Sequence, residues 1–291
     1  MPWLQLIIPT NENDADKLSD ALMDHGAVSV TLQDMQDQPV LEPELGTTPM
    51  WSQTRVVGLY DANENLKQVI AKIEQQLRIK ISDWKGEQLE DKDWVRAWMD
   101  SFKPMQFGKL LWVVPSNFEP PEKEAANILL DPGLAFGTGT HPTTSMCLEW
   151  LDAHPPLDLN IIDFGCGSGI LAIGALLLGA KHAEAIDLDP QALIATRDNA
   201  EKNNVATKIK TYLPKEFAAK KTPLLLANIL ASPLIELAPY FTKLTEKNGQ
   251  IVLSGILAEQ AEQVLCAYQD QFNIKIWKQL DDWVCLAGTK K

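Results

Sequence analysis

Three glycines at alternate positions, Gly165, Gly167 and Gly169, follow Asp163 in this chain. Apolar stretches lie immediately before and after this segment. Glycine is favoured where a buried strand turns tightly into a helix, because its backbone tolerates unusual dihedral angles and a ligand can approach without meeting a Cβ. The segment therefore predicts a ligand-binding turn between a strand and a helix.

A second acidic residue, Asp187, ends the strand-like segment 183–186, about 20 residues beyond the glycines. A carboxylate at this place suits the ribose hydroxyls of a nucleoside ligand. A dinucleotide-binding turn needs glycine at the sixth position counted from Gly165, and that position holds Ile170. Ordinary turn glycines of an α/β domain are the alternative, but the spaced acid and Asp187 agree independently. The pattern resembles the cofactor loop of seven-stranded S-adenosylmethionine-dependent methyltransferases.

A polar, glycine-rich stretch precedes the predicted cofactor strand. Residues 133–144 contain three glycines and four threonines. They lead into a helix that Thr140 or His141 can cap, with Pro142 in its first turn. An inert connector is the alternative, but a long hydrogen-bonding loop at this position can fold over a ligand. We therefore expect this stretch to take part in binding.

Asn228 is the candidate catalytic residue, because it ends the apolar run 224–227 at the edge of the sheet where ligands bind. An amide oxygen there can accept a hydrogen bond from a neutral amine and aim its lone pair at a methyl group. Ile229 and Leu230 follow, without the aromatic ring that would stack on a base. This favours an aliphatic amine over an adenine. No histidine or tyrosine neighbours Asn228 in sequence, so we expect desolvation in an apolar pocket to lower the pKa of the amine.

Composition narrows the class of partner. The chain has 291 residues, more than one domain usually holds, and a formal net charge of −13. Residues 1–100 contain 18 acidic and 9 basic residues, and residues 101–291 contain 21 and 17. Because nucleic-acid affinity depends on Lys and Arg, we expect no direct nucleic-acid binding. An acidic surface can steer a basic protein toward the enzyme or simply confer solubility.

The remaining features of composition point to the cytoplasm. Four scattered cysteines favour free thiols in a reducing compartment, and neither they nor the four histidines form a metal-binding pattern. No apolar run approaches membrane-spanning length. No feature marks an oligomer interface. We therefore expect a cytoplasmic monomer without a metal ion or a membrane segment.

The fold class predicted from periodicity is α/β with a small additional domain. Residues 1–90 alternate as β-α-β-β-α-β, which indicates a ferredoxin-like α+β domain, and residues 91–120 connect it to residues 121–291. In the linker, Trp94 and Trp98 are expected to pack between the domains. The last domain is predicted to hold a Rossmann-like seven-stranded sheet with an antiparallel terminal hairpin. Its strands are expected at 160–164, 182–187, 208–213, 223–228, 249–254, 272–278 and 283–288.

Over nearly its full length the chain resembles the ribosomal protein L11 methyltransferase family. The motifs that carry the resemblance are residues 133–144, 163–169 and 227–230, together with 93–104 of the linker. The resemblance implies methyl transfer from S-adenosylmethionine to lysine side chains and the α-amine of that large-subunit ribosomal protein. It also implies that the N-terminal domain holds the substrate and swings relative to the catalytic domain.

The family's cofactor contacts correspond to Thr144, Gly165, Asp187 and Asn228, to which the pattern adds Gly167 and Gly169. The alternative enzyme is a methyltransferase of RNA or of a small-molecule amine, and the negative charge disfavours RNA. A non-catalytic binding module would have a damaged glycine turn or a lost carboxylate, whereas both are intact.

Overall fold

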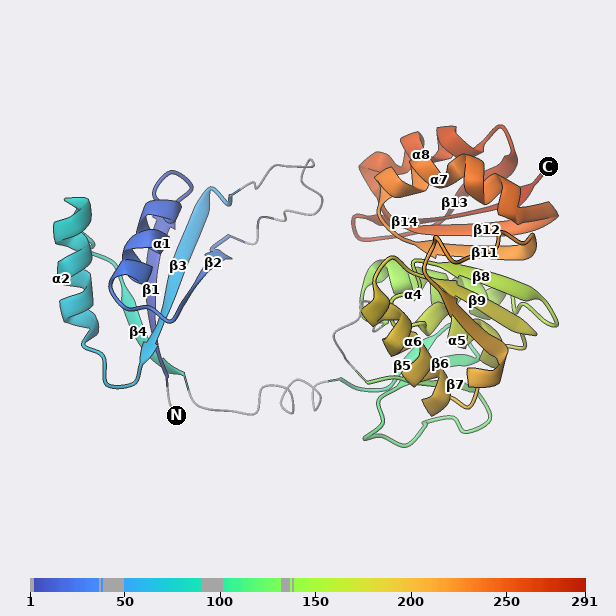
Figure 1. Cartoon of the computed structure of the whole chain (residues 1–291), viewed down its shortest axis with the longest axis horizontal. Helices are drawn as coiled ribbons and strands as arrows, with labels where there is room; N and C mark the ends of the chain where they lie inside the picture. Colours follow the sequence, from blue (N-terminus) through green and yellow to red (C-terminus); the bar gives the residue numbers. More distant parts are fainter. Residues whose placement is uncertain (1–2, 37, 39–49, 90–101, 132–136, 138) are drawn as a thin grey trace. The chain divides into compact units, whose positions relative to one another are not determined.

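The chain divides into two compact units, Met1–Trp94 and Val95–Lys291, whose elements are labelled in Figure 1. The computed structural model describes residues 3–36, 38, 50–89, 102–131, 137 and 139–291. Within these residues, no helix has the length and apolar character needed to cross a bilayer. The predicted tryptophans of the linker, Trp94 and Trp98, lie outside the described residues.

The first unit is a four-stranded antiparallel sheet with two helices. Its strand order is β2-β3-β1-β4, and its elements follow the β-α-β-β-α-β order expected from the sequence. In the core of this unit, alternate strand residues such as Leu6 and Ile8 pack with Leu22 and Ile73 of the helices. The elements are β1 (Trp3–Asn11), α1 (Ala15–Asp24), β2 (Ser29–Asp34), β3 (Gln53–Asp61), α2 (Leu66–Leu77) and β4 (Lys85–Leu89).

The second unit contains a seven-stranded mixed sheet, which confirms the predicted fold class. The strand order is β10-β9-β8-β11-β12-β14-β13, and β14 runs antiparallel to the other six strands. The strands are β8 (Asn160–Phe164), β9 (His182–Ile186), β10 (Ile209–Tyr212), β11 (Thr222–Asn228), β12 (Thr245–Leu257), β13 (Phe272–Leu280) and β14 (Trp283–Lys290). The helices are α4 (Pro142–Ala153), α5 (Ile170–Leu177), α6 (Pro190–Lys202), α7 (Ala231–Leu244) and α8 (Ala261–Tyr268).

Helices cover both faces of this sheet, with α4, α5 and α6 on one side and α7 and α8 on the other (Figure 1). Successive residues of a strand point to opposite faces. Ile161 therefore joins the core under α4–α6, whereas Ile162 joins the core under α7 and α8. Burial on both faces explains the continuous apolar run 224–227 of the central strand β11. The carboxyl ends of the parallel strands are left to form a site.

A second, three-stranded sheet belongs to the same unit and includes part of the predicted linker. It consists of β5 (Met105–Phe107), β6 (Leu111–Val114) and β7 (Ala126–Leu129) in the order β5-β6-β7. The side chain of Asp152, in α4, accepts backbone hydrogen bonds from Lys109, Leu110 and Leu111 at 2.7, 2.6 and 3.0 Å. Leu111 is fully buried in the core beneath α4 and α5. One carboxylate thus holds the β5–β6 turn against α4.

The contact between Asp152 and this turn predicts a measurable loss of stability. Asp152→Ala removes three charge-assisted hydrogen bonds and leaves backbone amides without partners, so the free energy of unfolding should fall by about 3 kcal/mol. Thermal or urea unfolding measures the loss. Asp198→Ala, at an exposed position of α6, is the matched control and should change stability by less than about 0.5 kcal/mol. Equal stability of the two variants would show that Asp152 does not hold the turn.

Candidate functional site

The predicted glycine turn joins β8 to α5, and all three of its glycines have positive φ. Gly165, Gly167 and Gly169 have φ of +79°, +53° and +79°, a region that other residues rarely occupy. A Cβ on Gly165 would overlap the side chain of Ile229, and one on Gly169 would lie 2.8 Å from Thr196 Cγ2. Glycine is therefore required here both by the backbone conformation and by close neighbours.

Neighbouring elements fix the turn in place. The amides of residues 165 and 166 donate to the carbonyl of Ile186, at the end of β9, at 2.7 and 3.0 Å. From α6, Thr196 Oγ1 and Asn199 Nδ2 donate to the carbonyls of residues 167 and 168 at 3.0 and 2.9 Å. The Ser168 hydroxyl donates to the carbonyl of Gly137 at 2.6 Å, which ties the upstream loop to the turn. These hydrogen bonds hold the backbone of the turn in one conformation.

Asp187 lies beside this turn, as its spacing predicts. Its Oδ2 accepts a hydrogen bond from the amide of Gly167 at 2.8 Å, and its Oδ1 accepts one from the amide of Asp189 at 3.0 Å. The side chain is half-buried. Each carboxylate oxygen has a further lone pair, so the group is oriented by the backbone and can still accept from hydroxyl groups of a ligand.

Asp163 is fully buried behind the turn. Its Oδ2 accepts from the amide of Ala172, in the first turn of α5, at 3.0 Å, whereas its Oδ1 has no hydrogen-bond partner among the described residues. Burial raises the pKa of this carboxyl to about 7, helped by the charge of Asp187 and opposed by the Ala172 amide. A carboxyl with this pKa is substantially protonated at neutral pH.

The structure brings together two predicted residues that are far apart in sequence, Asn228 and Thr144. The Asn228 side-chain nitrogen donates to Thr144 Oγ1 at 3.2 Å. Thr144 is fully buried in the first turn of α4, while Asn228 is half-buried at the end of β11. No group among the described residues donates to the amide oxygen, so this oxygen is an acceptor available to a ligand.

Asn228 also lines a largely apolar pocket of about 320 Å³. The rings of His141 and Trp283 meet edge to face in its wall, with centroids 5.0 Å apart and an interplanar angle of 69°. Burial lowers the pKa of His141, whose Nδ1 lies 2.7 Å from the hydroxyl of Thr143. The lining residues are His141, Thr143, Asn228, Ile229, Leu230, Gly255 and Trp283. The pocket can receive an aliphatic chain that ends at a polar group.

Trp283 and Gly255 line the pocket but were not predicted from the sequence to be site residues. They come from β14 and β12; β12 lies next to β11 in the sheet, and β14 lies next to β12. Gly255 has φ of +83°, and a Cβ there would overlap the carbonyl of Ile229. A glycine within an otherwise apolar strand is a recognised sign of close backbone approach, so this signal was present in the sequence. The position of Trp283 had no such local signal.

The predicted site residues gather at one edge of the sheet. Gly165, Asp187 and Asn228 follow or end β8, β9 and β11, three adjacent parallel strands. Thr144 reaches this edge from α4 through its hydrogen bond to Asn228. Of the predicted binding stretch 133–144, residues 133–136 and 138 lie outside the described residues. Within the described ranges, no cluster of three or more His, Cys, Asp or Glu side chains is suited to a metal ion.

The buried carboxyl of Asp163 predicts a specific dependence of stability on pH. Its pKa is about 7 in the folded protein against an ordinary value of 3.8. Between these values the folded state keeps a proton that the unfolded state has lost, so the free energy of unfolding decreases as pH rises from about 4 to 7. Asp163→Asn removes this penalty and should stabilise the protein at pH 8 by up to about 4 kcal/mol, with no gain near pH 4.

Thermal unfolding at several pH values measures the effect. Asp198→Asn, at an exposed position, is the control and should give the same small difference at every pH. A constant difference between Asp163→Asn and the unaltered protein from pH 4 to 8 would contradict the raised pKa.

Comparisons with known proteins agree with the motifs and extend them to the whole chain. The family model described as ribosomal protein L11 methyltransferase matches residues 2–291. The ribosomal protein L11 methyltransferase of Marinobacter nauticus is 51% identical over 296 residues, covering 100% of this chain and 99% of the relative. That of Pseudomonas putida strain GB-1 is 50% identical over 292 residues, covering 100% of both.

A solved structure shows similarity to the same family. The ribosomal protein L11 methylase of Lactobacillus delbrueckii subsp. bulgaricus superposes with a TM-score of 0.59 at 32% identity, covering 65% of this chain and 100% of the other. The resemblance inferred from the motifs is confirmed: this chain belongs to the ribosomal protein L11 methyltransferase family.

Proposed function

We propose that this protein transfers methyl groups from S-adenosylmethionine to ribosomal protein L11 in the cytoplasm, and that the acceptors are lysine side chains and the N-terminal α-amine. Its relatives are named for methylation of that ribosomal protein. The observation in this chain that carries the proposal is the amide of Asn228, which Thr144 orients beside an apolar pocket. An oriented acceptor at the end of such a pocket suits an amine on an aliphatic chain.

The residues at the glycine turn fit a nucleoside cofactor. S-adenosylmethionine, when bound, supplies a methyl group activated by a sulfonium sulfur. Asp187 is held by two backbone amides and offers further acceptor positions for ribose hydroxyls. Gly165 and Gly169 let the turn pack closely against Ile229 and Thr196, which fixes its backbone beside Asp187, where a ligand would lie. Asp187 and the glycines of the turn, with Thr144 and Asn228, form the proposed cofactor site.

The acceptor amine must be neutral to attack a methyl group. Deprotonating a lysine side chain at pH 7 requires roughly 4–5 kcal/mol, and an α-amine about 1 kcal/mol. An apolar pocket lowers the pKa of an entering amine because it disfavours the charged form. The oxygen of Asn228 then accepts one N–H of the neutral amine and fixes the direction of the lone pair. Desolvation and alignment are the two contributions assigned to this chain.

We assign recognition of the ribosomal protein to the first unit, Met1–Trp94, and methyl transfer to the second. Residues 1–100 contain twice as many acidic as basic residues, 18 against 9. Such an excess attracts a basic protein by long-range electrostatics. The protein is proposed to act as a monomer on this partner, without contacts to nucleic acid.

Variants of three site residues should separate binding from rate. Purified protein incubated with methyl-labelled S-adenosylmethionine and ribosomal protein L11 should label that protein on lysines and the N-terminus, read by mass spectrometry. Asn228→Ala should lower kcat about a hundredfold through loss of alignment. Thr144→Val should lower kcat about tenfold, because one hydrogen bond that orients Asn228 is lost. Asp187→Ala should weaken cofactor binding, measured by calorimetry, by at least about tenfold.

Thr144→Ser keeps the hydroxyl and is the matched control, expected within about threefold of the unaltered enzyme. Label in RNA, or no label in the ribosomal protein, would overturn the proposed substrate. A kcat unchanged by Asn228→Ala would overturn the role of the amide.

The rate should depend on pH through the substrate amine alone. Although His141 is distant from Asn228 in sequence, the structure places both in one pocket, which makes His141 the general base to be tested. Its pKa lies below 6.5, so a role as base would give the rate an acidic limb in that region. If desolvation suffices, the limb follows the amine and is unchanged in His141→Gln. A limb below pH 6.5 that disappears in His141→Gln would show that His141 takes the proton.

A further inference from the structure

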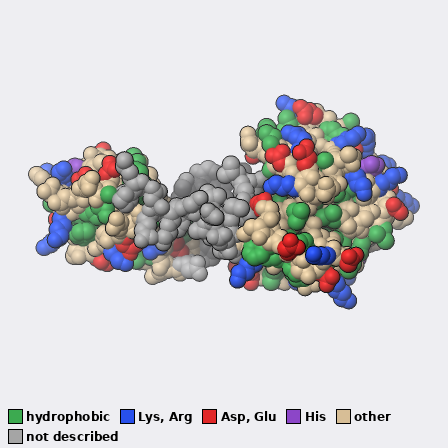
Figure 2. All heavy atoms as spheres, turned by 90° about the horizontal axis from the view of Figure 1, so that it is seen from below, with side chains coloured by type: hydrophobic (Ala, Val, Ile, Leu, Met, Phe, Trp, Pro, Cys, Tyr) green, Lys and Arg blue, Asp and Glu red, His purple; other side chains and the backbone are tan. Residues whose placement is uncertain are grey.

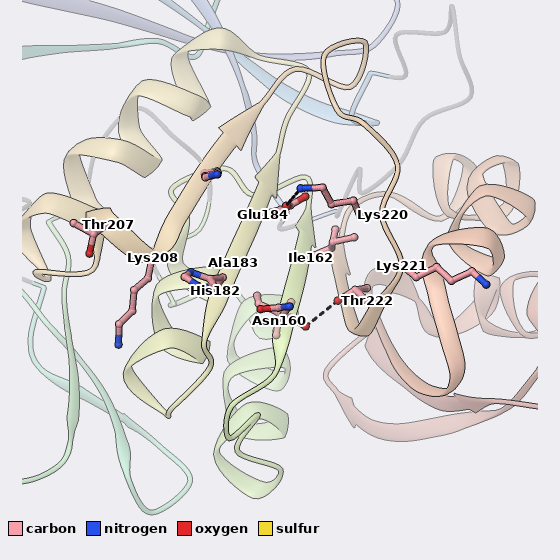
Figure 3. A pocket seen from close by; sticks show the side chains of 12 residues that line it. Asn160, Ile162, His182, Ala183, Glu184, Thr207, Lys208, Lys220, Lys221 and Thr222 are labelled. Carbon is pink, nitrogen blue, oxygen red and sulfur yellow. Dashed lines mark hydrogen bonds and ion pairs between the residues drawn. The ribbon is translucent and has the colours of Figure 1, made fainter.

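The second unit has another hollow, at the end of the sheet opposite the candidate site. It lies at the amino ends of β10, β9, β8 and β11 and has a volume of about 460 Å³. Asn160, His182 and Thr222 mark the starts of three of these strands, and Ala183 and Ile162 contribute to its floor. In Figure 3, Lys208 and Lys221 extend on opposite flanks of this floor. The hollow is here called the amino-edge hollow.

Its lining is basic in an acidic protein. Four lysines line it, Lys208, Lys210, Lys220 and Lys221, against a single carboxylate, Glu184, among the described residues. Over the face of each unit shown in Figure 2, by contrast, acidic and basic side chains are interspersed. The chain as a whole has a net charge of −13. The lining of this hollow is therefore positively charged, opposite in sign to the net charge of the chain.

Most of this positive charge is not neutralised by the protein. Lys220 forms an ion pair with Glu184 at 3.3 Å, drawn as a dashed line in Figure 3. Lys208, Lys210 and Lys221 have no carboxylate partner within the part of the chain that the structure describes. Burial and the charge of Lys221 both lower the pKa of nearby Lys290, so Lys221 stands close to a further cation. The unneutralised positive charge of these lysines would favour an anion that enters the hollow.

We propose that the amino-edge hollow binds the phosphate groups of a small phosphorylated molecule, up to the size of a nucleotide. Its volume is in the range of small-ligand sites. Lysine binds phosphate as a point charge, and a diphosphate has several charged oxygens that can reach more than one ammonium group. A long polyanion such as RNA fits less well, because it would also meet the field of a protein with a net charge of −13.

This site is separate from the cofactor site. Asn160 starts β8 and Phe164 ends it just before the glycine turn, which places the two edges about 13 Å apart along this strand. A ligand in the amino-edge hollow therefore does not compete for Asp187 or Asn228. The inference does not depend on which substrate is methylated.

Calorimetry on the full chain at low ionic strength tests the proposal. The probes are inorganic pyrophosphate and ADP, the latter with S-adenosylhomocysteine in excess so that ADP cannot occupy the cofactor site. Both should bind the unaltered protein, and the double variant Lys208→Ala/Lys221→Ala should weaken binding about tenfold. Glu184→Gln removes the competing carboxylate and should tighten binding by about threefold, a gain that misfolding cannot mimic.

Lys17→Ala/Lys123→Ala removes the same charge from exposed positions elsewhere and should change affinity by less than about twofold. Absence of binding by both probes at millimolar concentration would overturn the proposal. Equal weakening in the two double variants would also overturn it, because the effect would then be a general one of net charge. Tighter binding of a short RNA duplex than of ADP would replace the small ligand with a nucleic acid.

Discussion

Close packing of Ile229 between two glycines sets the geometry of the candidate site. Its side chain occupies the space that a Cβ on Gly165 would need, and its carbonyl occupies the space that a Cβ on Gly255 would need. Both glycines have positive φ, so the contacts exist only because these positions lack side chains. Ile229 directly follows Asn228. The spacing between the glycine turn, the Asn228 amide and the pocket wall is thus fixed by close packing around Ile229.

Two carboxyl groups beside the glycine turn differ in burial and in hydrogen bonding. Asp163 is fully buried, accepts one backbone amide, and has its pKa raised to about 7. Asp187 is half-buried and accepts hydrogen bonds from two backbone amides. The buried group supports the start of α5, and the more exposed group lies beside the glycine turn. The pattern of acid and glycine in the sequence marks both residues, but only burial distinguishes their roles.

Local sequence patterns predicted the strands and the glycine turn that carry the site, because each of these elements is determined by residues close together in sequence. The apolar runs before Asp163 and before Asn228 are strands whose carboxyl ends meet at one edge, as a parallel sheet requires. The short strands β5 and β7 could not be predicted in this way. They have three and four residues, too few for a periodic signal, and β6 and β7 pair in parallel across an intervening segment.

The contacts between residues that line the pocket could not be predicted from local patterns either. His141 and Trp283 are separated by most of the second unit in sequence, and they meet because α4, which His141 caps, packs against β12 and β14. The hydrogen bond from Asn228 to Thr144 likewise joins residues 84 positions apart. Sequence patterns indicated that each residue lay near a ligand, but not which residues contact one another.

The structure also bears on how the acceptor amine loses its proton. The sequence showed no basic side chain beside Asn228, and the pocket nevertheless contains His141. Burial is the cause of the lowered pKa of His141. An amine that enters the same pocket meets the same loss of solvation, and its pKa is lowered for the same reason. The burial that lowers the pKa of the His141 imidazole would also disfavour the charged form of an amine that enters the pocket.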